Sequence, residues 1–117
     1  MISPKLLTTI LMAVLTNSAD ASSDPGTANI AWANKSEVLS YRSCGCADSC
    51  WVAELRERTS KKLKARLRCD CATLFARYPA NSGERELPGS CAAINEQDDK
   101  MGAIAHTIKQ LAARKIP

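Results

Sequence analysis

Residues 44–71 read CGCADSCWVAELRERTSKKLKARLRCDC and hold five of the six cysteines in this chain of 117 residues. The cysteines form clusters of three, two and one: Cys44, Cys46 and Cys50, then Cys69 and Cys71, then Cys91. An even number of cysteines in a short secreted chain predicts a disulfide framework, because such a domain buries too little apolar surface to be stable by packing alone. The stretch therefore predicts a small domain cross-linked by disulfides.

Residues 48–78 also have the strongest helix propensity of the chain, since they are rich in Ala, Leu, Glu, Lys and Arg and contain no Gly or Pro. Eight of these residues, most of them apolar, recur at steps of three and four, which places them on one side of a helix. These residues are Val52, Leu55, Thr59, Leu63, Leu67, Cys71, Leu74 and Tyr78. The pattern predicts helix here, as one element or two.

The flanking sequence is also interpreted as helical. Asn34 as N-cap and Glu37 as its capping-box partner predict a short helix over residues 35–42. A loop is predicted over residues 79–89, which are rich in Pro, Gly, Asn and Ser. Met101, Ile104, Ile108 and Leu111 then form an apolar seam, which predicts a C-terminal helix to about Lys115. The predicted fold class is all-α: a small disulfide-stapled bundle made of a helical hairpin and a C-terminal helix.

The grouping of the cysteines favours the hairpin. Bonds within one cluster are expected to be strained, so the first cluster is expected to pair with both later clusters. A straight helix from residue 50 to residue 69 would separate its ends by about 28 Å, whereas disulfide partners need α-carbons within about 7 Å. We therefore expect the chain to fold back near Arg58–Ser60 and to pack residues 48–58 against 61–77. The alternative is one long helix, with Cys91 bonded to Cys69 or Cys71 and a local bond at the other end.

The N-terminal 21 residues have the features of a secretory signal peptide. Lys5 provides a basic residue, Leu6 to Leu15 form an apolar run, and Ala19-Asp20-Ala21 matches a cleavage site. A run of this length is too short for a transmembrane anchor. The sequence predicts a signal peptide (1–21), a flexible lead-in (22–33) and a single helical disulfide-rich domain (34–117), located in the periplasm or secreted.

A basic run lies within the predicted hairpin. Between residues 56 and 68 seven basic residues stand against Glu57 alone: Arg56, Arg58, Lys61, Lys62, Lys64, Arg66 and Arg68. This basic run predicts a face that docks a protein partner with an acidic surface, and the alternative is a solvated surface that keeps the domain soluble. A nucleic-acid partner is not expected for an exported chain with 4% aromatic residues.

The sequence offers little for catalysis or for metal binding. His106 is the single histidine and stands among apolar residues, so no Ser/His/Asp or Cys/His arrangement is predicted. The two Cys-x-Cys pairs, at 44 and 46 and at 69 and 71, offer four thiolates for zinc in principle, but an oxidising compartment consumes thiols. We predict a non-enzyme with no catalytic residue, no metal site and no cofactor.

These features together predict a small exported binding protein. Its most favoured function is that of an inhibitor or immunity-type protein that acts on a toxin or hydrolase of the cell envelope. One alternative is an accessory or structural component of a bacterial secretion or conjugation assembly. Another is a secreted effector or defence protein that binds anionic surfaces.

The first testable prediction concerns export. Mass spectrometry of the natively produced protein should show a chain that begins near Ser22 and has no free thiol. A chain that retains Met1 to Ala21, or several cysteines alkylated without prior reduction, would contradict both the compartment and the disulfide framework.

Overall fold

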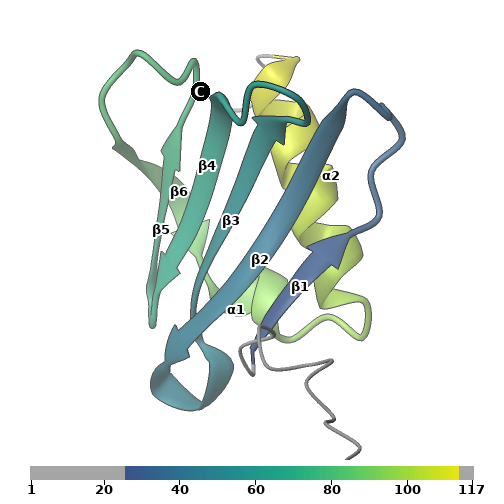
Figure 1. Ribbon diagram of the computed structural model, residues 1–117. Helices are drawn as coiled ribbons and strands as arrows, with labels where there is room; N and C mark the ends of the chain where they lie inside the picture. The colour runs from purple at the N-terminus through teal and green to yellow at the C-terminus, as the bar shows by residue number, and fades with distance from the viewer. Residues whose placement is uncertain (1–25, 114–117) are drawn as a thin grey trace, which may run out of the picture.

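The computed structural model describes residues 26–113 of the chain. Six strands form one antiparallel sheet in which neighbours in sequence are neighbours in space, and two helices follow (Figure 1). The strands are β1 (Thr27–Ile30), β2 (Glu37–Gly45), β3 (Cys50–Glu57), β4 (Leu63–Asp70), β5 (Thr73–Arg77) and β6 (Arg85–Ser90), with a single turn, η1 (Cys46–Asp48), between β2 and β3. The helices are α1 (Ala92–Asn95) and α2 (Lys100–Ala112). The predicted signal peptide, residues 1–21, lies outside the described residues.

The predicted all-α fold is wrong, because residues 48–78 contain the three strands β3, β4 and β5 instead of a helical hairpin. The buried residues of these strands alternate with half-buried ones, as in a sheet with one covered face. In β3, for example, Trp51, Ala53 and Leu55 are buried, while Val52 and Glu54 are not. Burial of this alternating set outweighs the helix propensity of Ala, Leu, Glu and Arg. The predicted reversal near Arg58–Ser60 is confirmed in position, as the turn between β3 and β4.

Three further expectations need correction. The helix predicted over residues 35–42 is the start of β2; the Asn34 side chain accepts a hydrogen bond from the Ser36 backbone N–H (3.0 Å) in a turn and caps no helix. Residues 27–30 of the predicted flexible lead-in pair with β2 as strand β1, and Ile30 is buried there. The predicted loop over residues 79–89 ends early, because β6 begins at Arg85.

The C-terminal helix is confirmed as α2. Asp99 is its N-cap and accepts a hydrogen bond from the Gly102 backbone N–H at 2.9 Å. Ile104, Ile108 and Leu111, from the predicted seam, are at most 3% exposed. They pack with the buried residues of the strands and with Ile94 of α1 in one hydrophobic core.

Both helices cover the same face of the sheet, and in Figure 1 they lie behind the strands. Three alanines of the central strands, Ala53, Ala65 and Ala76, are at most 1% exposed on this covered face. Small side chains beside Leu55 and Leu67 let the helix approach the sheet closely and interlock with it. The opposite face of the sheet, which we call the open face, carries the alternate strand residues, and neither helix of residues 26–113 lies over it.

Three disulfides close one end of the sheet: Cys44–Cys50, Cys46–Cys71 and Cys69–Cys91. The expectation that no bond forms within a cluster is wrong, because η1 reverses the chain and brings Cys44 and Cys50 together from β2 and β3, with their α-carbons 4.9 Å apart. Disulfides are typical of proteins of oxidising compartments, which agrees with the predicted export. Within residues 26–113, no helix is long and apolar enough to cross a membrane.

The second prediction concerns the unequal contribution of these disulfides. Cys69–Cys91 joins buried sulfurs across 22 residues and anchors α1 to β4, whereas Cys44–Cys50 spans 6 residues at the rim. Loop-closure entropy predicts that loss of the longer bridge lowers the free energy of unfolding by about 3.4 kcal/mol and loss of the shorter by about 2 kcal/mol. Urea unfolding of C69A/C91A and of C44A/C50A measures both values. An equal or reversed order would contradict this account.

Candidate functional site

The basic run predicted from the sequence lies on the β3–β4 hairpin, not on a helix, and the structure divides it. Arg56, Arg66 and Arg68 project from the open face of β3 and β4, while Arg58, Lys61 and Lys62 belong to the turn. Lys64 leaves the group, because it forms an ion pair with Glu37, which is 7% exposed beside Trp32. The hydrogen bond from Lys64 holds the pKa of the Glu37 carboxyl below its ordinary value.

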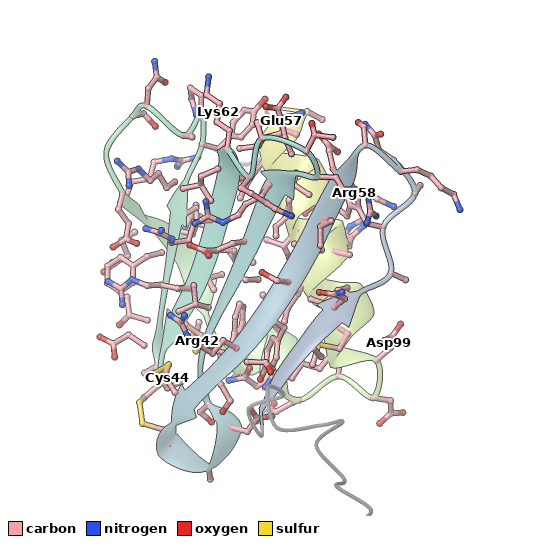
Figure 2. The ribbon with its side chains drawn as sticks, in the orientation of Figure 1. Arg42, Cys44, Glu57, Arg58, Lys62 and Asp99 are labelled. Carbon is pink, nitrogen blue, oxygen red and sulfur yellow. A yellow bond between two sulfur atoms is a disulfide. The ribbon has the colours of Figure 1, made fainter. Side chains whose placement is uncertain are left out.

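The open face brings together basic residues from four strands. Residues that pair directly across an antiparallel sheet share a face, and two cross-strand rows follow from the register. One row reads Arg42, Val52, Arg68, Phe75 and Glu86, and the next reads Ser40, Glu54, Arg66 and Arg77. In Figure 2 this face is turned towards the viewer.

Arg42, Arg77, Val52 and Phe75 are the open-face residues that the sequence argument missed. Arg42 and Arg77 lie outside the basic run, Val52 belongs to the pattern that predicted a helix, and Phe75 lies outside both sets. The available signal was a period of two, as in Ala65-Arg66-Leu67-Arg68-Cys69, where apolar and basic residues alternate.

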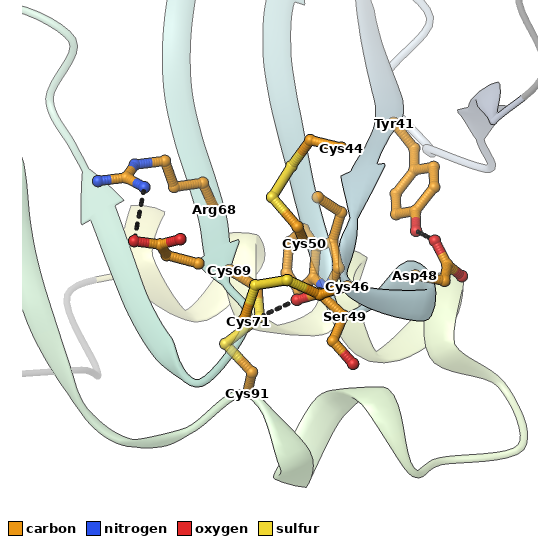
Figure 3. Close-up of a disulfide and its surroundings, with 12 residues drawn as sticks. Tyr41, Cys44, Cys46, Asp48, Ser49, Cys50, Arg68, Cys69, Cys71 and Cys91 are labelled. Carbon is orange, nitrogen blue, oxygen red and sulfur yellow. Dashed lines mark hydrogen bonds and ion pairs between the residues drawn. A yellow bond between two sulfur atoms is a disulfide. The ribbon is translucent and has the colours of Figure 1, made fainter.

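Arg68 occupies the middle of the first row. Its guanidinium lies 4.3 Å from the ring centroid of Phe75, a cation–π arrangement. It also donates two hydrogen bonds to the carboxylate of Glu84, at 3.0 Å from Nε and 2.8 Å from Nη2. Figure 3 shows Arg68 near the disulfides at one end of the sheet. The hydrogen bond with Arg68 lowers the pKa of Glu84 and raises that of Arg68 itself. The Arg68 side chain is therefore held flat against the sheet and is 33% exposed.

Glu54 holds two more arginines in the same way. Its carboxylate accepts from Arg66 Nε at 2.8 Å and from Arg56 Nη2 at 3.2 Å. Burial acts to raise the pKa of Glu54, but the two arginines together outweigh it and the net pKa is lowered. Arg77 donates from Nε to the Ser82 carbonyl at 2.9 Å. These contacts fix the guanidinium groups before any ligand arrives.

Arg42 differs from its neighbours. It is exposed at the lower part of the open face, as Figure 2 shows, and it makes no ion pair or hydrogen bond with its side chain to any residue of the described range. Arg42 therefore offers a complete guanidinium fork to a ligand, and a planar fork of this kind matches a carboxylate.

Polar groups at the disulfide end serve the scaffold. Lys100 of α2 donates to the backbone carbonyl and the carboxylate of Asp48, at 2.7 and 3.1 Å, and Tyr41 donates its hydroxyl to the same carboxylate. Burial is the largest cause that raises the pKa of the Tyr41 hydroxyl, and the hydrogen bond to Asp48 adds to it. The Trp51 indole donates to Asn95 Oδ1 at 2.7 Å. These contacts join the β2–β3 turn and β3 to the helices.

All six cysteines form disulfides with one another. The sulfurs of Cys50 and Cys71 lie within 4.8 Å of each other and of an Asp70 oxygen, but both sulfurs belong to disulfides, and zinc binds thiolates. His106 is exposed on α2 beside a shallow hollow that Asp99 and Thr107 also line. The absence of catalytic activity stays a prediction.

Comparisons with protein-family models, with curated protein sequences and with solved structures give no match for this chain.

The third prediction tests how the arginines are held. Because the folded pKa of Glu54 is depressed, its ionised form contributes stability above the ordinary pKa of 4.5 and loses that contribution as the pH falls through the folded pKa. We expect E54Q to lower the free energy of unfolding at pH 7 by about 1 kcal/mol and to flatten its decline below pH 4.5. E86Q is the matched control, because Glu86 is exposed on the same face without an ion pair in residues 26–113. Urea titrations from pH 7 to pH 3 measure both effects, and parallel profiles for E54Q and the wild type would contradict this role.

Proposed function

We propose that this protein is an exported, non-catalytic binding protein that docks an acidic protein surface on the open face, in the manner of an inhibitor or immunity-type protein of the cell envelope. The observation that carries the proposal is the set of guanidinium groups on the open face. Hydrogen bonds hold those of Arg56, Arg66, Arg68 and Arg77, and Arg42 keeps its donors for a ligand. Glu54 and Glu86 are the only acidic strand residues among these rows.

The physical form of the face supports protein binding. Arginine is enriched at the energetic centres of protein interfaces, together with aromatic residues. Here four of the five guanidinium groups, all but that of Arg42, are held by hydrogen bonds around half-buried Val52 and Phe75. A partner would therefore order few side chains on this surface, and the entropic cost of association would be small. An inhibitor that occludes its target needs this combination of a rigid scaffold and a broad preformed surface.

The proposal differs from the sequence prediction in its residues. The proposed surface includes Arg42 and Arg77, which the predicted one did not. It excludes Lys64, because the ammonium group of Lys64 pairs with Glu37. The turn residues Arg58, Lys61 and Lys62 remain at its edge.

The fourth prediction tests this surface by photo-crosslinking. A photoreactive phenylalanine analogue at position 75 should capture an acidic protein from extract of the native envelope or secretion medium, and the same analogue at His106 on α2 should not. We expect R42E to weaken the captured complex about ten-fold, which corresponds to about 1.4 kcal/mol, because one attraction becomes a repulsion. Binding of the wild type should also weaken as the salt concentration rises.

K109E is the control for R42E, because it makes the same change of charge on α2, on the other side of the sheet. Lys109 lies over the Trp32 ring at 5.6 Å, so thermal unfolding of both variants should be measured first. Equal capture from positions 75 and 106, or equal effects of R42E and K109E on affinity, would contradict the assignment of the open face as the docking surface.

A further inference from the structure

A small cavity lies at the end of the open face nearest the β3–β4 turn. It has a volume of about 150 Å³ and is lined by Val38, Ser40, Arg56, Glu57, Arg58 and Lys61. Val38 and Ser40 come from β2, whereas the charged residues come from the end of β3 and the turn that follows. Pockets that enclose a drug-sized ligand are typically about 300 Å³ or larger. This cavity suits one side chain of a partner better than a whole small molecule.

Two arginines of the cavity are fixed by backbone carbonyl groups. Arg56 donates from Nη1 to the Lys61 carbonyl at 2.9 Å, and Arg58 donates from Nε to the Lys35 carbonyl, also at 2.9 Å. Arg56 also donates one hydrogen bond to the carboxylate of Glu54. A guanidinium group has five N–H donors, so both arginines keep most of theirs for a ligand.

Lys61 supplies the third positive charge. Its backbone adopts a left-handed conformation (φ 66°) and its N–H bonds to the Glu57 carbonyl at 3.0 Å, which fixes its place in the turn. Within the described part of the chain its ammonium group has no partner. Glu57 is the one acidic group in the lining, and its carboxylate already accepts a hydrogen bond from Ser60 Oγ at 2.8 Å. Positive charge is therefore in excess around the cavity.

We propose that this cavity, named here the carboxylate pocket, receives one aspartate or glutamate side chain of the protein that docks on the open face. The inference rests on the proposed function. The cationic groups match a carboxylate in charge and in hydrogen bonding, while the half-buried Val38 offers an apolar wall to the methylene groups of an acidic side chain. A carboxylate bound in this pocket fixes the position of the partner on the open face.

The fifth prediction is tested first without the partner. Titration of the ¹⁵N-labelled protein with sodium acetate at constant ionic strength should shift the backbone signals of Lys61 and Val38 and the Nε–H signals of Arg56 and Arg58. K61Q should weaken acetate binding about five-fold, as expected for the loss of one surface charge about 4 Å away. K62Q is the matched control, because Lys62 is the next residue of the same turn and is not part of the pocket lining. Equal effects of K61Q and K62Q would overturn the proposal, as would tighter binding of inorganic phosphate than of acetate.

A second variant tests the pocket by shape and not by charge. V38F places a larger side chain, well suited to a strand, at the wall of the pocket and should abolish the acetate-induced shifts. In the complex captured through position 75, K61Q and V38F should each raise the dissociation rate several-fold, while K62Q should not. If these variants leave the complex unchanged but R42E weakens it, the pocket inference fails and the docking surface stands. If nothing is captured at position 75 but acetate binds as expected, the docking proposal fails, and with it the assignment of the pocket to a partner side chain.

Discussion

Burial of Trp51 is the interaction on which the rest of the fold depends. Its side chain is 0% exposed, it lies opposite Cys69 in the sheet, and its indole donates a hydrogen bond to Asn95 of α1. The Tyr41 ring lies beside it, with ring centroids 6.2 Å apart, and the ammonium group of Lys100 lies 5.9 Å from the Trp51 ring. One residue thus connects the central strands, the Cys69–Cys91 bridge and the start of α2. The helices are held to this one face of the sheet, and the open face follows as a consequence.

The open face is exposed to water, whereas the helices cover the other face. A sheet face without a helix over it must be compatible with water, yet its backbone needs side chains that pack. Arginine satisfies both requirements, because its aliphatic stem covers the sheet while its guanidinium group reaches polar partners. Glu54 and Glu84 complete the arrangement by binding the guanidinium groups of Arg66 and Arg68. The result is a flat charged layer, one side chain deep, whose positions are set by the register of the strands.

Some of this was predictable from the sequence, and particular residues explain why the rest was not. Helix α2 was predicted because its seam of Ile104, Ile108 and Leu111 fits no period but that of a helix. In β3 to β5, by contrast, the leucines fit both a helical period and a period of two. The buried positions between them are Ala53, Ala65 and Ala76, whose small side chains carry a weak hydrophobic signal and favour helix. Helix propensity therefore predicted a helix at positions where the packing of the sheet against α2 requires small side chains.

The predicted disulfide pairing was wrong for a related reason. Whether Cys44 can bond Cys50 depends on the backbone between them: along a helix the expected geometry was strained, but a reversal in η1 places both cysteines on neighbouring strands. Gly45, with a φ of 120°, permits this reversal. The location of the basic run was readable from the sequence, but its division between the open face, the turn and the Glu37 ion pair was not, because that division follows from strand alternation and register.

The acidic residues of the open face also bear on selectivity. The chain has a formal net charge of +4, so attraction to any anionic surface would be expected if the guanidinium groups were free. Most of them are already paired with Glu54 and Glu84, and a ligand that offers only diffuse negative charge gains little by competing with these preformed pairs. A partner must instead place carboxylates where donors remain: at Arg77, which within residues 26–113 bonds only the Ser82 carbonyl, and at Arg42 and around Lys61, which lie towards opposite ends of the face. Separated anchoring points, with arginine–glutamate pairs between them, favour one arrangement of acidic groups over others, and such discrimination distinguishes a specific protein interface from general attraction to anions.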